Sequence, residues 1–274
     1  AAEAELAANE SAGARLLFKG GQDYPTRLAQ FDDAPPILSA KGAIHLLSRP
    51  GVAMVGARNA SINAQRLAQS LAEDLSSEGY VVISGLARGI DAAAHNGALA
   101  GGTIAVIAGG IDVVYPSENT DLHESIAEAG LLLAEMPPGT QPTPRHFPIR
   151  NRMIGAIALG TVVVEAAERS GSLITARETA ERGGEVMAVP GSPLDPRSQG
   201  CNHLIREGAT LIRDIADITE CLSRPIGVGL PSAQDWKTGR LTPGPPESVE
   251  RCREAILQGL GPETSNIDLS LIHI

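Results

Sequence analysis

Short segments that combine glycine with arginine or hydroxyl residues recur through the middle of the chain. They occupy residues 56–59, 84–91, 109–112, 150–152 and 170–175. Glycine allows a ligand to approach the backbone, hydroxyl groups donate hydrogen bonds, and arginine supplies positive charge. Any single glycine here is explained more simply as a steric requirement of a strand-to-helix turn. The recurrence of arginines and hydroxyls favours an anion-binding pocket.

Catalysis by a metal ion is not indicated. Asp91 and His95 stand four residues apart and could share a metal, but no third ligand accompanies them. An aspartate near a helix start commonly stabilises that helix, so we favour a structural role for this pair. Glu165 and Glu168 could form an acid/base pair, yet the nucleophile and zinc patterns GxSxG and HExxH are both missing.

Cofactor chemistry is not indicated either. The lysines are Lys19, Lys41 and Lys237, so the central region lacks the lysine of a phosphate loop, a Schiff base or a kinase. The first turn reads Gly-Ala-Arg and departs from the dinucleotide-binding pattern GxGxxG. We therefore predict no cofactor and no catalytic residue.

The segments that carry these residues alternate between strand and helix patterns. Continuous Val, Ile and Leu runs predict strands at 52–55, 81–84, 103–108, 131–135, 161–165, 185–189 and 210–212. Helical spacing predicts helices at 60–78, 90–100, 122–129, 152–159, 173–182 and 202–207. This alternation predicts an α/β fold with a doubly wound, mostly parallel sheet. Because the loops at Gly56, Ser84 and Ser170 follow the carboxyl ends of strands, they should converge on one edge of the sheet.

The chain divides into four expected parts. Residues 1–50 form a small N-terminal region broken by prolines, and 51–222 form the sheet domain. Residues 223–247 are rich in proline and glycine, which predicts a linker. Residues 248–274 begin with helical spacing but stop before another domain is complete, and the chain lacks an initial Met, so we expect a fragment of a longer protein.

Composition limits the class of protein. No apolar run approaches the roughly 18 residues of a membrane span, and no signal peptide is recognisable, so we expect a soluble cytoplasmic protein without a membrane partner. The three cysteines have no CxxC spacing, which argues against disulfides and zinc. A formal charge of −10 disfavours nucleic-acid binding unless arginines cluster locally.

At these residues the sequence resembles the DNA processing protein A family, also called DprA or Smf. The matching pieces are GARNAS at 56–61, SGLARGIDAAAH at 84–95, AVIAGGIDVVYPSEN at 105–119, FPIRNRMI at 147–154, VVVEAAERSGSLITAR at 163–177 and AVPGSPLDPRSQGCNHLIREGA at 188–209. They run in the family's order over about residues 51–222. Weaker likenesses link residues 24–42 to the family's region before the sheet and the C-terminal piece to the start of its winged-helix domain.

The resemblance implies an extended Rossmann fold, a homodimer, and a protein without an established catalytic step. Its implied function is to bind and protect incoming single-stranded DNA and to load the RecA recombinase onto it during natural transformation of competent cells. The apolar residues Leu204, Ile205, Leu211, Ile212 and Ile215 could serve self-association, although a helix–sheet core explains them equally well.

The resemblance maps a DNA-binding pocket onto residues that the glycine, arginine and hydroxyl pattern also indicates. With the neighbouring turn residues, the expected DNA- or phosphate-binding set is Gly56, Arg58, Ser84, Gly85, Arg88, Gly109, Gly110, Phe147, Arg150, Asn151, Arg152, Ser170, Gly171, Ser172 and Thr175. Phe147 and Tyr115 are the aromatic residues beside this set, where they could stack on bases or simply pack.

An enzyme acting on a nucleotide or its phosphoribosyl group is the alternative function, since related Rossmann folds use a similar glycine-rich pocket. The PGGxGTxxE pattern of the phosphoribohydrolases is absent, because Gly160 and Thr161 lead directly into VVVEAAE. The sequence therefore favours binding without turnover.

Overall fold

The computed structural model describes residues 2–223 of the chain. The expected C-terminal fragment, and the expected linker beyond residue 223, lie outside these residues. Among the described residues, no helix is long and apolar enough to cross a bilayer.

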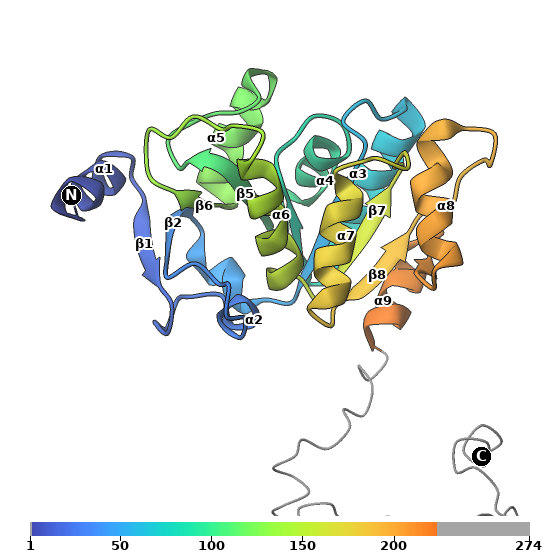
Figure 1. Ribbon diagram of the computed structural model, residues 1–274, viewed down its shortest axis with the longest axis horizontal. Helices are drawn as coiled ribbons and strands as arrows, with labels where there is room; N and C mark the ends of the chain where they lie inside the picture. The colour runs from blue at the N-terminus through green and yellow to red at the C-terminus, as the bar shows by residue number, and fades with distance from the viewer. Residues whose placement is uncertain (1, 224–274) are drawn as a thin grey trace, which may run out of the picture. The chain divides into compact units, whose positions relative to one another are not determined.

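A single nine-stranded sheet organises the described residues (Figure 1). Its strand order is β1-β2-β6-β5-β4-β3-β7-β8-β9. The bounds are β1 Arg15–Phe18, β2 Ile37–Gly42, β3 Gly51–Gly56, β4 Val81–Ser84, β5 Thr103–Gly110, β6 Leu131–Met136, β7 Gly160–Val164, β8 Glu185–Ala188 and β9 Thr210–Leu211. The strands from β6 to β9 in this order are parallel, and the core of β3, β4 and β5 is buried on both faces. The predicted mostly parallel, doubly wound fold is confirmed.

Helices cover both faces of the sheet, as the continuous apolar strands require. One layer contains α2 Thr26–Ala29, α6 His146–Ile157, α7 Ser172–Glu181 and α8 Gln199–Arg206. The other contains α3 Ile62–Ser77, α4 Ile90–Ala98, α5 Thr120–Ala129 and α9 Ile215–Ser223. The remaining helix α1 spans Ala2–Ser11, and short 3-10 turns occupy Ile44–Ser48, Ser117–Asn119 and Pro196–Ser198.

The segment before Gly51 extends the same sheet. β1 pairs antiparallel with β2, placing Phe18 opposite Ile37, and β2 pairs antiparallel with β6. Leu38 of β2 is buried in the same apolar cluster as Leu133 of β6. Strand direction therefore changes at the boundary expected near residue 51, while the core continues across it.

Helix α6 begins earlier than the sequence predicts. The expected helix started at residue 152, but α6 begins at His146, so Arg150, Asn151 and Arg152 are helical and not turn residues. The physical reason is the position of Pro148, which lies in the first turn of α6. Proline is tolerated there, because its missing N–H would have no intrahelical acceptor.

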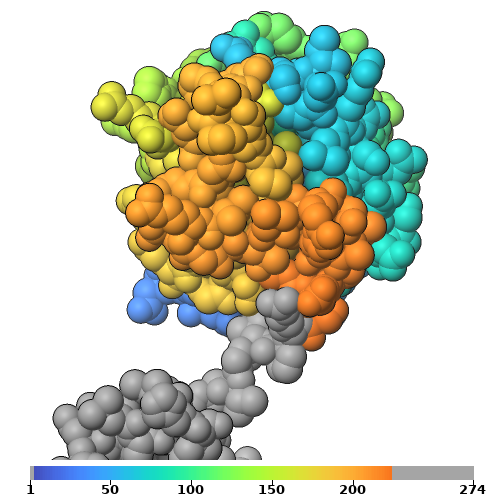
Figure 2. Space-filling model, turned by 90° about the vertical axis from the view of Figure 1, so that its right-hand side faces the viewer, coloured from blue at the N-terminus to red at the C-terminus, as the bar shows by residue number. Residues whose placement is uncertain are grey.

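The apolar residues near the C-terminal edge of the sheet mostly pack inside the unit. Leu204 and Ile205 contact the cluster beneath α6 and α7, while Ile212 and Ile215 join the cluster beneath α3. Leu211 remains 41% exposed. Figure 2 faces this side of the molecule, where the residues of α8 and α9, in orange, cover the end of the sheet.

Gly97 of α4 allows α3 and α4 to pack closely. A substitution at this residue tests how much the close packing contributes to stability. A Cβ at residue 97 would lie 2.1 Å from the carbonyl oxygen of Gln69 and 3.1 Å from Cβ of Ala72. Gly97→Ala should lower the free energy of unfolding by about 1–3 kcal/mol, because this overlap outweighs the better helix propensity of alanine. Urea unfolding measures the change.

Gly171 is the matched control. It has a helical φ of −61° and no atom within 4 Å of its ideal Cβ, so Gly171→Ala should be neutral or slightly stabilising. If Gly97→Ala were as stable as the wild type, the close packing of α3 on α4 would be contradicted.

Candidate anion-binding site

A cavity of about 840 Å³ lies where the strand order reverses. β3 is flanked by β4 on one side and by β7 on the other. The chain runs from β3 through β4 and β5 to β6, and then crosses back to β7 on the other side of β3. Ligands of open parallel sheets bind at such a switch point, beyond the carboxyl ends of the strands. The cavity wall is formed by the turn after β3 and the first turns of α6 and α7.

Most of the expected residues line this cavity or a neighbouring one of about 340 Å³. The larger cavity is lined by Gly56, Arg58, Phe147, Arg150, Asn151, Ser170, Gly171, Ser172 and Thr175. The smaller cavity adds Gly85, Arg88 and Gly109, and it shares Arg58, Phe147 and Arg150 with the larger. The expected convergence of the turns on one edge of the sheet is confirmed.

Three expected residues line neither cavity. Ser84 is fully buried, and its hydroxyl donates a hydrogen bond to the carbonyl oxygen of Met54 at 2.6 Å. Gly110 is packed against the backbone, since a Cβ there would lie 2.5 Å from the carbonyl oxygen of Pro137. Arg152 points toward Glu135, with 2.6 Å between Nη2 and Oε1.

Two side chains of α4 accept hydrogen bonds from the backbone N–H groups of the turn after β4. The N–H groups of Gly85 and Ala87 donate to Oδ2 of Asp91 at 3.2 and 3.3 Å. The N–H of Leu86 donates to Nε2 of His95 at 3.3 Å, and Leu86 adopts a left-handed φ of 56°. These three donors therefore hold the turn together and are not offered to an anion. Asp91 and His95 have the structural role that the sequence analysis favoured.

His95 is held as a neutral imidazole. Thr103 Oγ1 donates to the carbonyl oxygen of Val82 at 2.9 Å, so the 2.7 Å contact between Thr103 Oγ1 and His95 Nδ1 uses the proton on Nδ1. Nε2 is then free to accept from Leu86. Burial, assisted by the charge of Arg150, lowers the pKa of His95 to about 3.

Arg150 is a buried cation at the base of both cavities. It is 5% exposed, and Nη1 donates to the carbonyl oxygens of Gly85 and Val106. Burial lowers the pKa of Arg150 to about 10, while the nearby Asp91 carboxylate opposes that shift. Glycine at residue 85 makes room for this guanidinium, because a Cβ there would lie 1.8 Å from Nη1 in its present position. Arg150 thus supports the turn after β4 as well as contributing charge.

Exposed arginines surround the mouth of the larger cavity. Arg58 lies over the ring of Phe147, with 5.2 Å between its Cζ atom and the ring centroid. Arg169 and Arg197 also line the cavity, although the sequence analysis did not select them. Arg169 directly precedes the turn at 170–175 and could have been recognised there. Arg197 comes from the segment after β8. No local sequence pattern shows that this residue lies at the cavity.

Charge in the larger cavity is strongly unbalanced. Arg58, Arg150, Arg169 and Arg197 line it, whereas Asp91 is the single acidic residue of the lining. Asp91 is buried beside Arg150, and burial raises its pKa while Arg150 opposes the rise. Arg197 is paired with Asp195 at 2.9 Å and with Glu165 at 3.6 Å, so the positive charge at the mouth of the cavity comes mainly from Arg58 and Arg169, although the chain carries a formal charge of −10.

The first turn of α7 completes the cavity wall with polar groups. Ser170 and Ser172 have their Oγ atoms 2.7 Å apart, and α7 begins at Ser172. Asn151 of α6 donates a long hydrogen bond of 3.4 Å to the carbonyl oxygen of Gly171. A helix N-terminus of this kind favours negative charge.

Glu165 and Glu168 are not assembled as an acid/base pair. Both carboxylate oxygens of Glu165 bind Ser61, accepting from its N–H at 2.9 Å and from its hydroxyl at 2.6 Å. Glu165 thus anchors the start of α3, and Glu168 lines neither cavity. No group of three or more possible metal ligands occurs among residues 2–223.

The fold is that of a mostly parallel α/β protein with a candidate anion-binding cavity at its switch point. The comparisons with known proteins then identify the family. The family described as DNA recombination-mediator protein A matches residues 15–223, and the chain belongs to that family.

Curated relatives and solved structures agree with this assignment. The DNA processing protein DprA of Streptococcus pneumoniae is 47% identical over 197 residues, covering 71% of this chain and 70% of its own. The Bacillus subtilis protein of the same name is 41% identical over 218 residues, covering 78% and 73%.

Two solved structures are similar to this fold. The X-ray structure of DNA processing protein A from S. pneumoniae has a TM-score of 0.75 and 42% identity, covering 80% of this chain and 77% of that one. The Helicobacter pylori protein, described for its single-stranded DNA binding mode, has a TM-score of 0.70 and 28% identity, covering 77% and 97%.

The burial of His95 predicts a pH dependence of stability. The unfolded chain takes up a proton near the ordinary pKa of 6.5, whereas the folded protein resists protonation until about pH 3. The contribution of His95 to the free energy of unfolding is fully present above pH 6.5. It is lost as the pH falls below 6.5, and the free energy of unfolding then decreases by up to about 1.4 kcal/mol per pH unit. Urea unfolding between pH 8 and pH 5 measures this slope.

His95→Gln should remove that part of the slope, whatever its cost in stability at pH 7. The exposed His203 on α8 provides the control, and His203→Gln should leave the slope as it is in the wild type. An unchanged slope in His95→Gln would mean that His95 is not the buried neutral group described here.

Proposed function

We propose that this protein binds single-stranded DNA in the cavity at the β3/β7 switch point, without chemical turnover. The observation that carries the proposal is the lining of the larger cavity, in which four arginines and the Phe147 ring face a single buried carboxylate. Phosphates would lie on the arginines and bases on the aromatic rings.

The phosphate part of the proposal rests on charge and geometry. Guanidinium groups suit phosphate recognition because they are always charged and donate several hydrogen bonds in a fixed plane. Arg58 and Arg169 are exposed at the mouth of the cavity, whereas Arg197, 49% exposed at the side chain, is paired with Asp195 and Glu165. The first turn of α7 adds a partial positive charge to the same wall.

The preference for a single strand rests on the aromatic residues. Tyr115 is 48% exposed, and its ring centroid lies 5.6 Å from that of Phe147. Aromatic rings bind unpaired bases by stacking, and a duplex keeps those faces inside. The H. pylori relative is described as binding single-stranded DNA, which supports the same proposal for this chain.

The finer parts of the proposal follow from family membership. We infer that the protein acts in the cytoplasm as a homodimer and loads RecA onto incoming DNA during natural transformation. The relatives named DNA processing proteins support the DNA-processing part of this inference, whereas the location, the homodimer and RecA rest on the resemblance of the sequence motifs alone. The alternative of a nucleotide hydrolase is not favoured by any observation, because the carboxylate of Glu165 is engaged by Ser61.

Arg58→Ala tests the phosphate part. The variant should bind single-stranded DNA more weakly by a similar factor for all sequences, because phosphate contacts carry no sequence information. The slope of log affinity against log salt should become shallower by about 0.7 for each phosphate that the variant no longer neutralises. Stability should change by less than about 0.5 kcal/mol, because the side chain is exposed.

Arg15→Ala is the matched control for Arg58→Ala. Arg15 is an exposed arginine on the edge strand β1, on the far side of β4, β5, β6 and β2 from β3. Its replacement removes the same charge and should leave the salt slope unchanged. Equal affinities and slopes for Arg58→Ala and the wild type would place the DNA elsewhere.

Phe147→Leu tests the base-stacking part. The variant should lose about 1–3 kcal/mol of binding free energy for each base that stacks on the ring, with no change in salt slope. An oligonucleotide with abasic sites supplies the control, since wild type and variant should bind it equally. A Phe147→Leu defect of the same size on abasic DNA would contradict stacking.

A further inference from the structure

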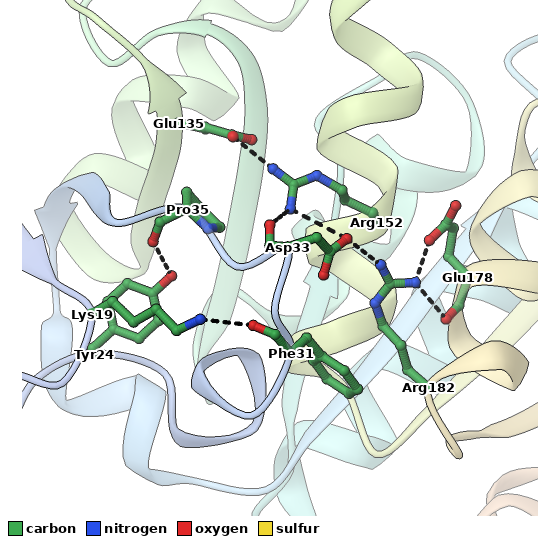
Figure 3. A network of polar contacts seen from close by, with 9 residues as sticks. All are labelled: Lys19, Tyr24, Phe31, Asp33, Pro35, Glu135, Arg152, Glu178 and Arg182. Carbon is green, nitrogen blue, oxygen red and sulfur yellow. Dashed lines mark hydrogen bonds and ion pairs between the residues drawn. The ribbon is translucent and has the colours of Figure 1, made fainter.

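A second polar cluster lies on the layer of α6 and α7, outside both cavities (Figure 3). At its centre, the carboxylate of Asp33 lies between two arginines. Its Oδ2 atom is 2.6 Å from Nη2 of Arg182 and 3.6 Å from Nη1 of Arg152. Arg152 belongs to α6, and Arg182 is the C-cap residue that directly follows α7. One carboxylate from the N-terminal segment therefore bridges two helices.

The two arginines depend on acidic partners because they are largely buried. The side chain of Arg152 is 17% exposed and that of Arg182 is 11% exposed. Glu135 of β6 also pairs with Arg152, and Glu178 of α7 also pairs with Arg182. Asp33, whose side chain is 49% exposed, is the carboxylate that both arginines share. Its removal would leave each arginine with one acidic partner, Glu135 or Glu178, and no shared counter-charge between the two helices.

The loop that presents Asp33 is fixed on both sides. Lys19 Nζ donates to the carbonyl oxygen of Phe31 at 2.8 Å, and the hydroxyl of Tyr24 donates to the carbonyl oxygen of Pro35 at 2.5 Å. The Arg182 guanidinium also lies over the Phe31 ring, 5.4 Å from its centroid. Figure 3 shows these contacts around the Asp33 carboxylate. The bridge is thus made by a preorganised loop.

Helices α6 and α7 carry opposite parts of the cavity wall. Phe147 and Asn151 belong to α6, whereas Ser172 and Thr175 belong to α7. The helices touch where Gly155 faces Thr179, since a Cβ at 155 would lie 2.9 Å from the Thr179 nitrogen. At the cavity, the hydrogen bond from Asn151 to Gly171 is long, at 3.4 Å. The placement of the two walls therefore depends on contacts made away from the cavity.

We propose that Asp33 is a positioning residue for the DNA site, which sets the spacing of α6 and α7 and thereby the width of the cavity between them. The inference rests on the proposed function for its link to DNA, but its structural part can be measured without DNA. It gives Arg152 a role through helix position instead of phosphate contact.

Asp33→Asn tests the proposal in binding. Removal of a negative charge would by itself strengthen DNA binding slightly. Weaker binding by this variant would therefore have to come from a change in the structure of the site. We expect the affinity for single-stranded DNA to fall about 3- to 30-fold, the range typical of indirect coupling, with an unchanged salt slope. Asp33→Glu should restore most of the affinity because it restores the charge.

Asp23→Asn is the matched control. Asp23 pairs with Arg15 at 2.9 Å at the β1 edge, so this variant removes the same charge from the same N-terminal segment without touching α6 or α7. It should retain wild-type or slightly higher affinity. A fall equal to that of Asp33→Asn, or a shallower salt slope in Asp33→Asn, would overturn the positioning role.

A distance measurement tests the helix spacing directly. Nitroxide labels at Ile149→Cys on α6 and Arg177→Cys on α7 would report on the two helices, since both residues are exposed. Cys201 and Cys221 are buried, and Cys252→Ser removes the remaining thiol. In DNA-free protein, Asp33→Asn should shift or broaden the dipolar distance distribution, and Asp33→Glu should return it to that of the wild type.

The two measurements separate failure of this inference from failure of the proposed function. An unchanged distance distribution in Asp33→Asn overturns the positioning role, whatever the affinity. A changed distribution in a protein whose wild type does not bind single-stranded DNA keeps the spacing role of Asp33 and overturns the proposed function, and with it the link from spacing to DNA.

Discussion

The buried charge of Arg150 is the constraint on which the site depends. A guanidinium that is 5% exposed needs both a counter-charge and hydrogen-bond acceptors, or the fold would bear a large desolvation cost. Asp91 of α4 supplies the charge, and the carbonyl oxygens of Gly85 and Val106 supply acceptors. Four elements, β4, β5, α4 and α6, are therefore held in one arrangement at the carboxyl edge of the sheet.

Because of this constraint, the groups that hold the turn after β4 in place differ from the groups that are available to a ligand. The backbone donors after β4 are used by Asp91 and His95, so the turn that looks most like a phosphate cradle is internally satisfied. In the proposed function, an anion is therefore recognised by side chains at the mouth of the cavity, above all Arg58, and by the first turn of α7. A rigid floor with exposed arginines suits a long, uniformly charged ligand better than a reaction that needs a positioned base.

The N-terminal segment also contacts the helices that form the cavity walls. β1 and β2 lengthen the sheet beyond β6, and the loop before β2 places Asp33 between the two arginines of α6 and α7. With the proposed positioning role of Asp33, the walls of the cavity are braced by the Arg150 cluster beneath and by Asp33 outside. Both braces pair a largely buried guanidinium with a carboxylate from a distant part of the chain.

The sequence by itself determined the parallel sheet, the glycine turns and their common edge, because apolar runs and glycine preferences act over a few neighbouring residues. A structural role for Asp91 could also be anticipated from helix-start preferences, but its actual partners, the N–H groups of Gly85 and Ala87, could not. Tertiary structure alone decided that Ser84 binds Met54, that Arg152 faces Asp33 and that Arg197 reaches the cavity. The same hydroxyl or guanidinium can bind a ligand or a protein group, and the choice depends on which partners folding brings within hydrogen-bond distance, which local spacing does not encode.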